Sequence, residues 1–147
     1  MYVPVYQVQL VREGSIRNRA QLTVPDQAAR AARSLIPDDG QEHFGVFLLD
    51  VRHRMIGALD LCVGSLSGAV VHPRELFAPA IVHKAAAVVL FHCHPSGDVS
   101  PSEEDIALTR RLVAGGALLG IEVLDHVIVT HDSVGSPYHS FSAHGQL

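Results

Sequence analysis

Hydrophobic and polar positions repeat with two different periods along this chain, and these periods predict a mixture of strands and helices. Residues 3–11 alternate between apolar and polar side chains, which predicts a strand with one solvated face. Residues 85–92 form a continuous apolar run with a β-branched middle, which is typical of a central strand covered on both faces. In full, the predicted strands span residues 3–11, 44–50, 55–63, 85–92, 123–130 and, as a short strand, 138–142.

Three helices are predicted between these strands. A stripe of apolar residues at helical spacing predicts the first over about 23–36, with Pro25 in its first turn. The second begins at Pro73, and we expect Pro79 to kink or split it, because a proline ring inside a helix removes one hydrogen bond. The third is predicted over 102–116. Strands that alternate with helices predict an α/β or α+β fold.

Length and composition predict one globular unit. The chain has 147 residues, near the modal size of a domain, so we expect a single domain over 1–147. Hydrophobic residues make up 48% and charged residues 18%, which excludes an intrinsically disordered chain. The formal net charge of −4 gives no overall basic surface of the kind that nucleic-acid binders carry. The first 33 residues are an exception, because five arginines against two acidic residues give them a net charge of +3. That stretch leaves binding to DNA open as an alternative.

The sequence indicates no targeting or membrane-spanning segment. Its first residues lack the cationic region and the long apolar region of a signal peptide. The best apolar run, 85–91, is far shorter than the roughly 18 residues of a membrane span. Cys62 and Cys93 are too few for a disulfide framework or a four-cysteine zinc site. We therefore expect a cytoplasmic protein with no membrane partner.

Two histidines at the end of the predicted central strand carry the chemical hypothesis. His92 and His94 are two residues apart, and alternate side chains of an extended chain share a face. Both imidazoles should therefore point the same way and Cys93 the other way. Asp105 follows a turn that contains proline and glycine, and it falls in the first turn of the next predicted helix, where it can approach the same point. Two imidazoles and one carboxylate with an open fourth position are the ligand set of a catalytic zinc site.

Each of these residues also has a purely structural interpretation. Ser102 and Asp105 fit the N-cap and the acidic first turn of a helix, a pairing that needs no metal. A histidine at a strand end is more often hydrogen-bonded than coordinated. Cys93 is expected to face the core rather than a metal, and Cys62 to fill apolar space. From the residues alone, the metal and the structural interpretations of 92–105 both stay open.

A zinc hydrolase also needs a base to take a proton from the water that the metal activates. Glu42 is the best candidate, because it lies just before the apolar strand at 44–50, where a loop can present it inward. The alternative is that Glu42 is a solvated residue after a turn. Glu103 and Glu104 compete as bases, although acidic residues in a first helical turn also favour the helix dipole.

The spacing of these residues resembles a known motif. The JAMM motif of the JAB/MPN metallopeptidase superfamily is similar to the series His92-x-His94-Pro95, six residues, Ser102, two residues, Asp105. The glutamate-bearing element that precedes that motif is similar to Glu42-x-x-Gly45. The RadC family of bacterial proteins is the closer resemblance, over the stretches 71–77, 94–97, 101–111 and 125–126. This resemblance covers roughly residues 41–142 and is most specific over 92–111.

The resemblance implies a fold and a set of roles. The fold would be of the MPN type, a curved mixed sheet flanked by helices, similar in plan to cytidine deaminases. His92, His94 and Asp105 would hold zinc (Zn²⁺), with water in the fourth position. Glu42 would be the general acid/base, and Ser102 would hydrogen-bond the water or steady the oxyanion.

Active members of the superfamily cleave amide or isopeptide bonds, some of them at ubiquitin-like modifiers. The resemblance therefore implies a zinc metallopeptidase or isopeptidase that acts on a peptide or a modified protein. RadC proteins carry a historical DNA-repair label, so two alternative functions stay open. They are a DNA-repair-associated binding module and a metal-dependent nuclease. The helix-hairpin-helix region common in RadC proteins is not expected in residues 1–40, where one strand and one helix are predicted. A zinc deaminase is excluded, because its His-x-Glu and Pro-Cys-x-x-Cys motifs are absent from the sequence.

Overall fold

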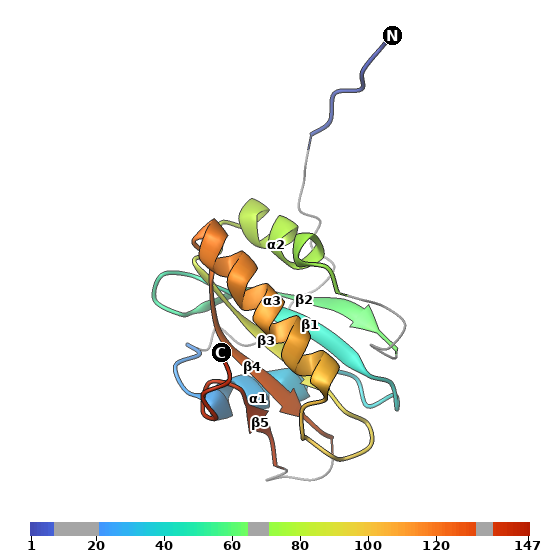
Figure 1. The fold of residues 1–147 in the computed structure, drawn as a ribbon, viewed down its shortest axis with the longest axis vertical. Coiled ribbons are helices and arrows are strands. Elements are labelled where there is room, and N and C mark those ends of the chain that lie inside the picture. The colour runs from blue at the N-terminus through green and yellow to red at the C-terminus, as the bar shows by residue number, and fades with distance from the viewer. Residues whose placement is uncertain (8–20, 65–70, 132–136) are drawn as a thin grey trace.

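The computed structural model describes residues 1–7, 21–64, 71–131 and 137–147 (Figure 1). Its elements are α1 Pro25–Leu35, β1 His43–Leu49, β2 Met55–Val63, α2 Pro73–Val82, β3 Ala87–Cys93, α3 Glu103–Leu119, β4 Glu122–Val129 and β5 His139–Ser140. The five strands of the described residues form one sheet in the order β2-β1-β3-β4-β5. Strands β3 and β4 are parallel and the other neighbouring pairs are antiparallel, so the sheet is mixed.

The sheet topology brings three chain segments to the same region. Strands β1 and β3 are antiparallel, with His43 opposite Cys93, so the start of β1 lies beside the end of β3. Residues 94–102 then lead from β3 into α3, and this helix is the crossover that allows β3 and β4 to run parallel. The start of β1, the end of β3 and the start of α3 are therefore close together.

Helices cover both faces of the sheet, α1 on one side and α2 with α3 on the other (Figure 1). The side chains of β3 alternate between two hydrophobic clusters, because successive residues of a strand point to opposite faces. Val89 and Phe91 pack in the cluster that contains the alanines of α1, whereas Val88 and Leu90 pack in the cluster of α2 and α3. The predicted mixed α/β fold with a central strand buried on both faces is confirmed.

Capping residues decide where α3 begins and ends. Ser102 is its N-cap, and Gly120, with a φ of 72°, ends it in the left-handed conformation. The helix therefore continues past the predicted end near Gly116. At Gly116 the helix lies so near the sheet connection that an added Cβ would overlap the carbonyl oxygen of Ile121. That glycine permits close packing and does not terminate the helix.

Helix α2 continues through Pro79, so of the two expected outcomes, a kink or a split, the split is wrong. The hydrogen bond that a proline nitrogen cannot make would go to the carbonyl of Glu75, in the first turn. Glu75 is exposed, and water can satisfy that carbonyl. Among the described residues, every helix is too short or too polar to cross a bilayer.

The strand predicted over 3–11 is wrong where the structure describes it. Residues 1–7 adopt no regular structure and extend away from the domain (Figure 1). Tyr2 and Val5 are almost fully exposed, at 103% and 97%. A strand needs a neighbour for its backbone hydrogen bonds, and alternation of side chains does not supply one. Residues 8–11 and the loop expected over 12–20 lie outside the described residues.

Gly45 of β1 occupies a position where the sheet leaves no room for a side chain. A Cβ added there would overlap the ring of Phe91 on β3 and the backbone oxygen of Leu59 on β2. That backbone oxygen belongs to a paired strand and cannot move alone. We therefore expect Gly45→Ala to lower the free energy of unfolding by about 3 kcal/mol, measured by urea denaturation.

Gly57→Ala on β2 is the matched control for this substitution. The atom nearest to a Cβ added at Gly57 lies at 3.4 Å, which is ordinary contact. We expect a change in the free energy of unfolding within about 1 kcal/mol. Equal stability of the two variants would contradict the proposed steric restriction at Gly45.

Candidate metal centre

The end of β3 carries two imidazoles near the face that α2 and α3 cover. His92 is fully buried, and it follows Val88 and Leu90 on that face. Cys93 is buried in the cluster on the α1 side, which confirms the predicted core position of its side chain. His94 lies one residue past the strand, with a side chain that is 13% exposed. The two histidine rings have centroids 4.5 Å apart.

One ring nitrogen of His94 is bonded to the loop that follows β3. Its Nδ1 lies 2.7 Å from the backbone oxygen of Asp98. Because a carbonyl oxygen only accepts, Nδ1 carries the proton and donates it. The other nitrogen, Nε2, lies 3.2 Å from Asp105 Oδ2 and 3.8 Å from Glu42 Oε1. The nitrogen that faces the two carboxylates is therefore the one that can offer a lone pair to a metal.

Asp105 approaches the histidines from the first turn of α3. The hydroxyl of Ser102 accepts from the backbone N–H of Asp105 at 3.1 Å, and Asp105 Oδ2 accepts from the backbone N–H of Ser102 at 2.8 Å. The carboxylate is 2% exposed, and its Oδ1 lies 3.2 Å from His92 Nδ1. The predicted cap is confirmed, and it is compatible with a metal ligand because it aims the carboxylate at both rings.

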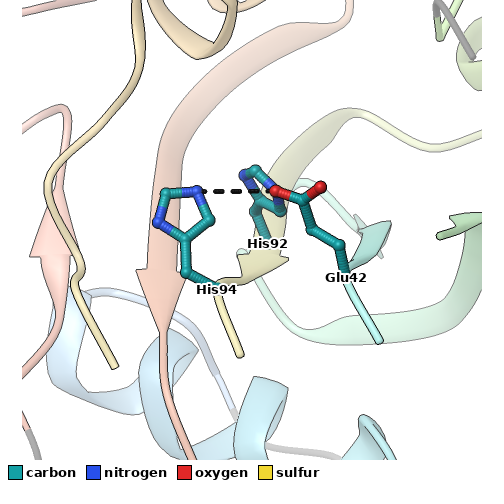
Figure 2. A group of neighbouring side chains, drawn as sticks. All are labelled: Glu42, His92 and His94. Carbon is teal, nitrogen blue, oxygen red and sulfur yellow. Dashed lines mark hydrogen bonds and ion pairs between the residues drawn. The ribbon is translucent and has the colours of Figure 1, made fainter. Parts of the chain in front are cut away.

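Glu42 directly precedes β1, and the antiparallel pairing of β1 with β3 places it beside the histidines. Its Oε1 lies 3.0 Å from His92 Nε2. Figure 2 shows the carboxylate of Glu42 reaching toward both rings. The Glu42 side chain is 24% exposed, so it meets the rings from the solvent side, whereas the buried Asp105 meets them from within.

His43 anchors the strand start that carries Glu42, and sequence analysis did not single it out. Its Nδ1 lies 2.9 Å from Asp60 Oδ2, and its Nε2 lies 3.0 Å from both carboxylate oxygens of Asp39. Burial lowers the pKa of His43, but the hydrogen bonds to Asp60 and Asp39 outweigh it and raise the pKa above its ordinary value. The ring thus ties the loop before β1 to β2. Only the Asp39 contact is local enough for the sequence to suggest it.

The charges of the cluster follow from these contacts. Burial raises the pKa of Asp105, but the contacts with His92 and His94 outweigh it and hold that pKa well below its usual range. Burial also opposes charge on His94, yet the Asp105 carboxylate and the Asp98 backbone oxygen raise its pKa. The Asp105 carboxylate is therefore ionised at neutral pH, and its negative charge favours a positive charge on the neighbouring His94 ring.

The donor set fits a divalent metal ion. Glu42, His92 and His94 each offer one ligand atom, and these three atoms lie within 4.8 Å of one another. Asp105 adds carboxylate oxygens at 3.2 Å from both rings. Nδ1 of His92 is buried and has no hydrogen-bond partner among the described residues, because its approach to Asp105 lacks hydrogen-bond geometry. A buried polar atom without a partner is costly, and imidazole with carboxylate is a ligand combination that zinc accepts.

An open cavity of about 540 Å³ lies beside this cluster and gives access to Glu42 and His94. Its lining residues are Gly40, Gln41, Glu42, Gly64, His94, Pro95 and Ser96. Residues 65–70 and 132–136 lie outside the described residues. Glu103 and Glu104, the competing candidates for a base, are exposed on the first turn of α3.

The hydrogen bonds of Asp125 and His126 go to the C-terminal turn and to α3. Asp125 accepts from the Ser140 hydroxyl at 2.6 Å and from the Ser142 backbone N–H at 2.9 Å, which ties the C-terminal turn to β4. His126 is fully buried, and its Nδ1 lies 2.7 Å from Thr109 Oγ1 of α3. Sequence analysis did not single out Thr109, and its contact with His126 joins α3 to the next element, β4, across 17 residues.

Comparison with known proteins gives a consistent result. The family model described as RadC-like JAB domain matches residues 22–146, a longer stretch than residues 41–142, over which the sequence resembles the RadC family. A UPF0758 protein of Syntrophomonas wolfei is 42% identical over 120 residues, which cover 79% of this chain and 51% of the relative. A UPF0758 protein of Rubrobacter xylanophilus is 45% identical over 143 residues, which cover 95% of this chain and 61% of the relative. The chain thus spans about half the length of the curated relatives that it matches.

Proposed function

This chain belongs to the family of RadC-like JAB domains, and from that membership we propose that it is a zinc-dependent hydrolase of peptide or isopeptide bonds. One observation carries the proposal. The start of β1, the end of β3 and the start of α3 bring two carboxylates and two imidazoles into mutual contact beside an open cavity. This arrangement is the donor chemistry that a hydrolytic metal ion needs.

The different exposure of the two carboxylates supports an assignment of roles. Asp105 is buried, capped and ionised, which suits a metal ligand together with His92 and His94. Glu42 lines the cavity, where a general base can reach both water and substrate. Zinc held by these residues would supply Lewis acidity, which would lower the pKa of water to about 7 and polarise a carbonyl oxygen.

The chain's own residues would then move the protons. Glu42 would take a proton from the attacking water onto its Oε1. It would then deliver this proton to the leaving nitrogen, so that one carboxylate acts first as a base and then as an acid. Ser102 accepts a hydrogen bond from the Asp105 N–H, so the proton of its own hydroxyl can be donated to the water or to the oxyanion.

We place the activity in the cytoplasm, on a peptide or a modified protein, and rank it above the alternatives that involve DNA. Arg30 donates to Asp26, and Arg33 donates to the backbone oxygens of Thr130 and Pro137. The two arginines of the basic N-terminal stretch that the structure describes are therefore engaged within the chain. Nothing in these contacts favours a phosphate backbone over a peptide.

The test is an assay of the purified protein with peptide, isopeptide and DNA substrates, accompanied by metal analysis. We expect near-stoichiometric zinc, cleavage of a peptide or isopeptide substrate, loss of cleavage with EDTA and recovery when zinc is restored. Protein that holds no zinc even after reconstitution would contradict the proposal. EDTA-sensitive cleavage of DNA without cleavage of either peptide class would replace it with the nuclease alternative.

A further inference from the structure

His126 of β4 is a buried polar residue among aromatic rings beside the candidate metal centre, and its ring centroid lies 6.0 Å from that of His92. Its side chain is fully buried, its ring stacks on Phe141 with centroids 4.5 Å apart, and it meets Phe44 edge-on at 5.6 Å. Burial, with a smaller contribution from nearby His92, lowers the pKa of His126 to about 3, so the ring is neutral. A phenylalanine would fill this space without burying a polar atom.

Thr109 links His126 to the backbone of Asp105. Its Oγ1 lies 2.6 Å from the Asp105 carbonyl oxygen, one helical turn earlier, and 2.7 Å from His126 Nδ1. A carbonyl oxygen only accepts, so the Thr109 hydroxyl donates its single proton to the backbone oxygen of Asp105. The Thr109 oxygen then accepts a hydrogen bond from the Nδ1–H of His126. This direction of hydrogen bonding fixes the tautomer of the ring.

The fixed tautomer leaves His126 with an unsatisfied nitrogen. Nε2 is buried and has no hydrogen-bond partner among the described residues. Leaving a polar atom unsatisfied costs stability, and in native proteins such an atom requires an explanation. What the protein gains at this position is the bond from His126 to Thr109, which an apolar ring could not make.

That bond bears directly on the geometry of the metal centre. Asp105 lies on α3, whereas His92 lies on β3, so their separation depends on how the first turn of α3 sits on the sheet. His126 is opposite Leu90 in the parallel pair of β4 and β3. It therefore offers α3 a fixed hydrogen-bonding point on the strand next to the one that carries the histidines.

We propose that Thr109 and His126 are positioning residues, whose hydrogen-bonded chain holds the first turn of α3 so that Asp105 meets His92 and His94. This inference rests on the proposed function, since it requires Asp105 to be a metal ligand. Neither residue touches substrate or metal. Their effect passes through the Asp105 backbone.

The first test is Thr109→Val, which replaces the hydroxyl with a methyl group of similar volume. We expect zinc affinity, measured by competition with a chromophoric chelator, to fall by about 10–100-fold. The visible absorption spectrum of the Co²⁺-substituted protein should change as well, because it reports the geometry of the ligands. Thr109→Ser keeps the hydroxyl and is the matched control, with zinc affinity and spectrum close to those of the wild type.

The second test is His126→Phe, which keeps an aromatic ring and removes both nitrogens. We expect the metal-free variant to melt at or above the temperature of the metal-free wild type, because the unsatisfied nitrogen is gone. Its zinc affinity should nevertheless fall and its Co²⁺ spectrum should change. A merely structural role would give the opposite result, with a lower melting temperature and an unchanged spectrum.

The outcomes separate this inference from the proposed function. Wild-type zinc affinity and spectrum in both Thr109→Val and His126→Phe would overturn the inference alone. Equal losses in Thr109→Ser and Thr109→Val would also overturn it, because packing rather than the hydroxyl would then matter. If Thr109→Val fails to fold, His126→Phe decides. A wild-type protein that binds neither ion would overturn the proposed function, and the positioning role with it.

Discussion

Replacement of Glu42 with glutamine is expected to lower hydrolysis by about 10²–10⁴-fold while zinc stays bound. Glutamine has nearly the same shape but cannot accept a proton from water at neutral pH. The Glu42 side chain is partly exposed and lines the cavity, and the buried position among the histidines belongs to Asp105. The measurement is kcat/KM on the cleaved peptide or isopeptide, together with the zinc content of the variant by mass spectrometry.

Glu104→Gln is the matched control for Glu42→Gln. Glu104 is an exposed carboxylate next to Asp105 in the sequence, on the first turn of α3. We expect activity and zinc content near those of the wild type. If Glu42→Gln loses its zinc together with its activity, Glu42 is a ligand rather than a base, as the close approach of its ligand atom to those of His92 and His94 would allow.

Features with a local origin could be predicted from the sequence. The strand period places His92 on one face and Cys93 on the other, and both positions are confirmed. The capping box of Ser102 and Asp105 is equally local, because both hydrogen bonds lie within one helical turn. Backbone geometry leaves few alternatives at such positions, so one sequence suffices to predict them.

Contacts between segments that are separated along the chain could not be predicted from local sequence patterns. Glu42 and His92 are 50 residues apart and meet only because β1 pairs with β3 in one register, which apolar periodicity does not specify. The resemblance to a known motif suggested Glu42, but it offered nothing for the bond between Thr109 and His126. The strand prediction over 3–7 was wrong for the same reason. Alternation of apolar and polar side chains predicts which face of a strand is buried, but it does not supply the neighbouring strand.

Replacement of Asp105 with asparagine is expected to cost the protein its zinc and to lower hydrolysis by at least about 10³-fold, because the several kcal/mol that a Lewis acid supplies are lost. Asparagine keeps the size of the side chain, and its oxygen can still accept from the Ser102 N–H, so the helix cap remains. What disappears is the negative charge that lies 3.2 Å from both imidazoles. Zinc per protein after dialysis and kcat/KM are the measurements.

Asp98→Asn makes the same chemical change on the loop after β3 and serves as the control. Its side-chain oxygen accepts from the Ser100 N–H at 2.9 Å, which asparagine can also do, and the bond to His94 comes from the Asp98 backbone. We expect this variant to keep zinc and activity. Circular dichroism of the Asp105→Asn protein in EDTA separates loss of metal from loss of fold. Full zinc and activity in Asp105→Asn would instead transfer the ligand role to Glu42. The two carboxylates are therefore assigned by opposite results: one substitution removes the metal, and the other removes only the proton transfer.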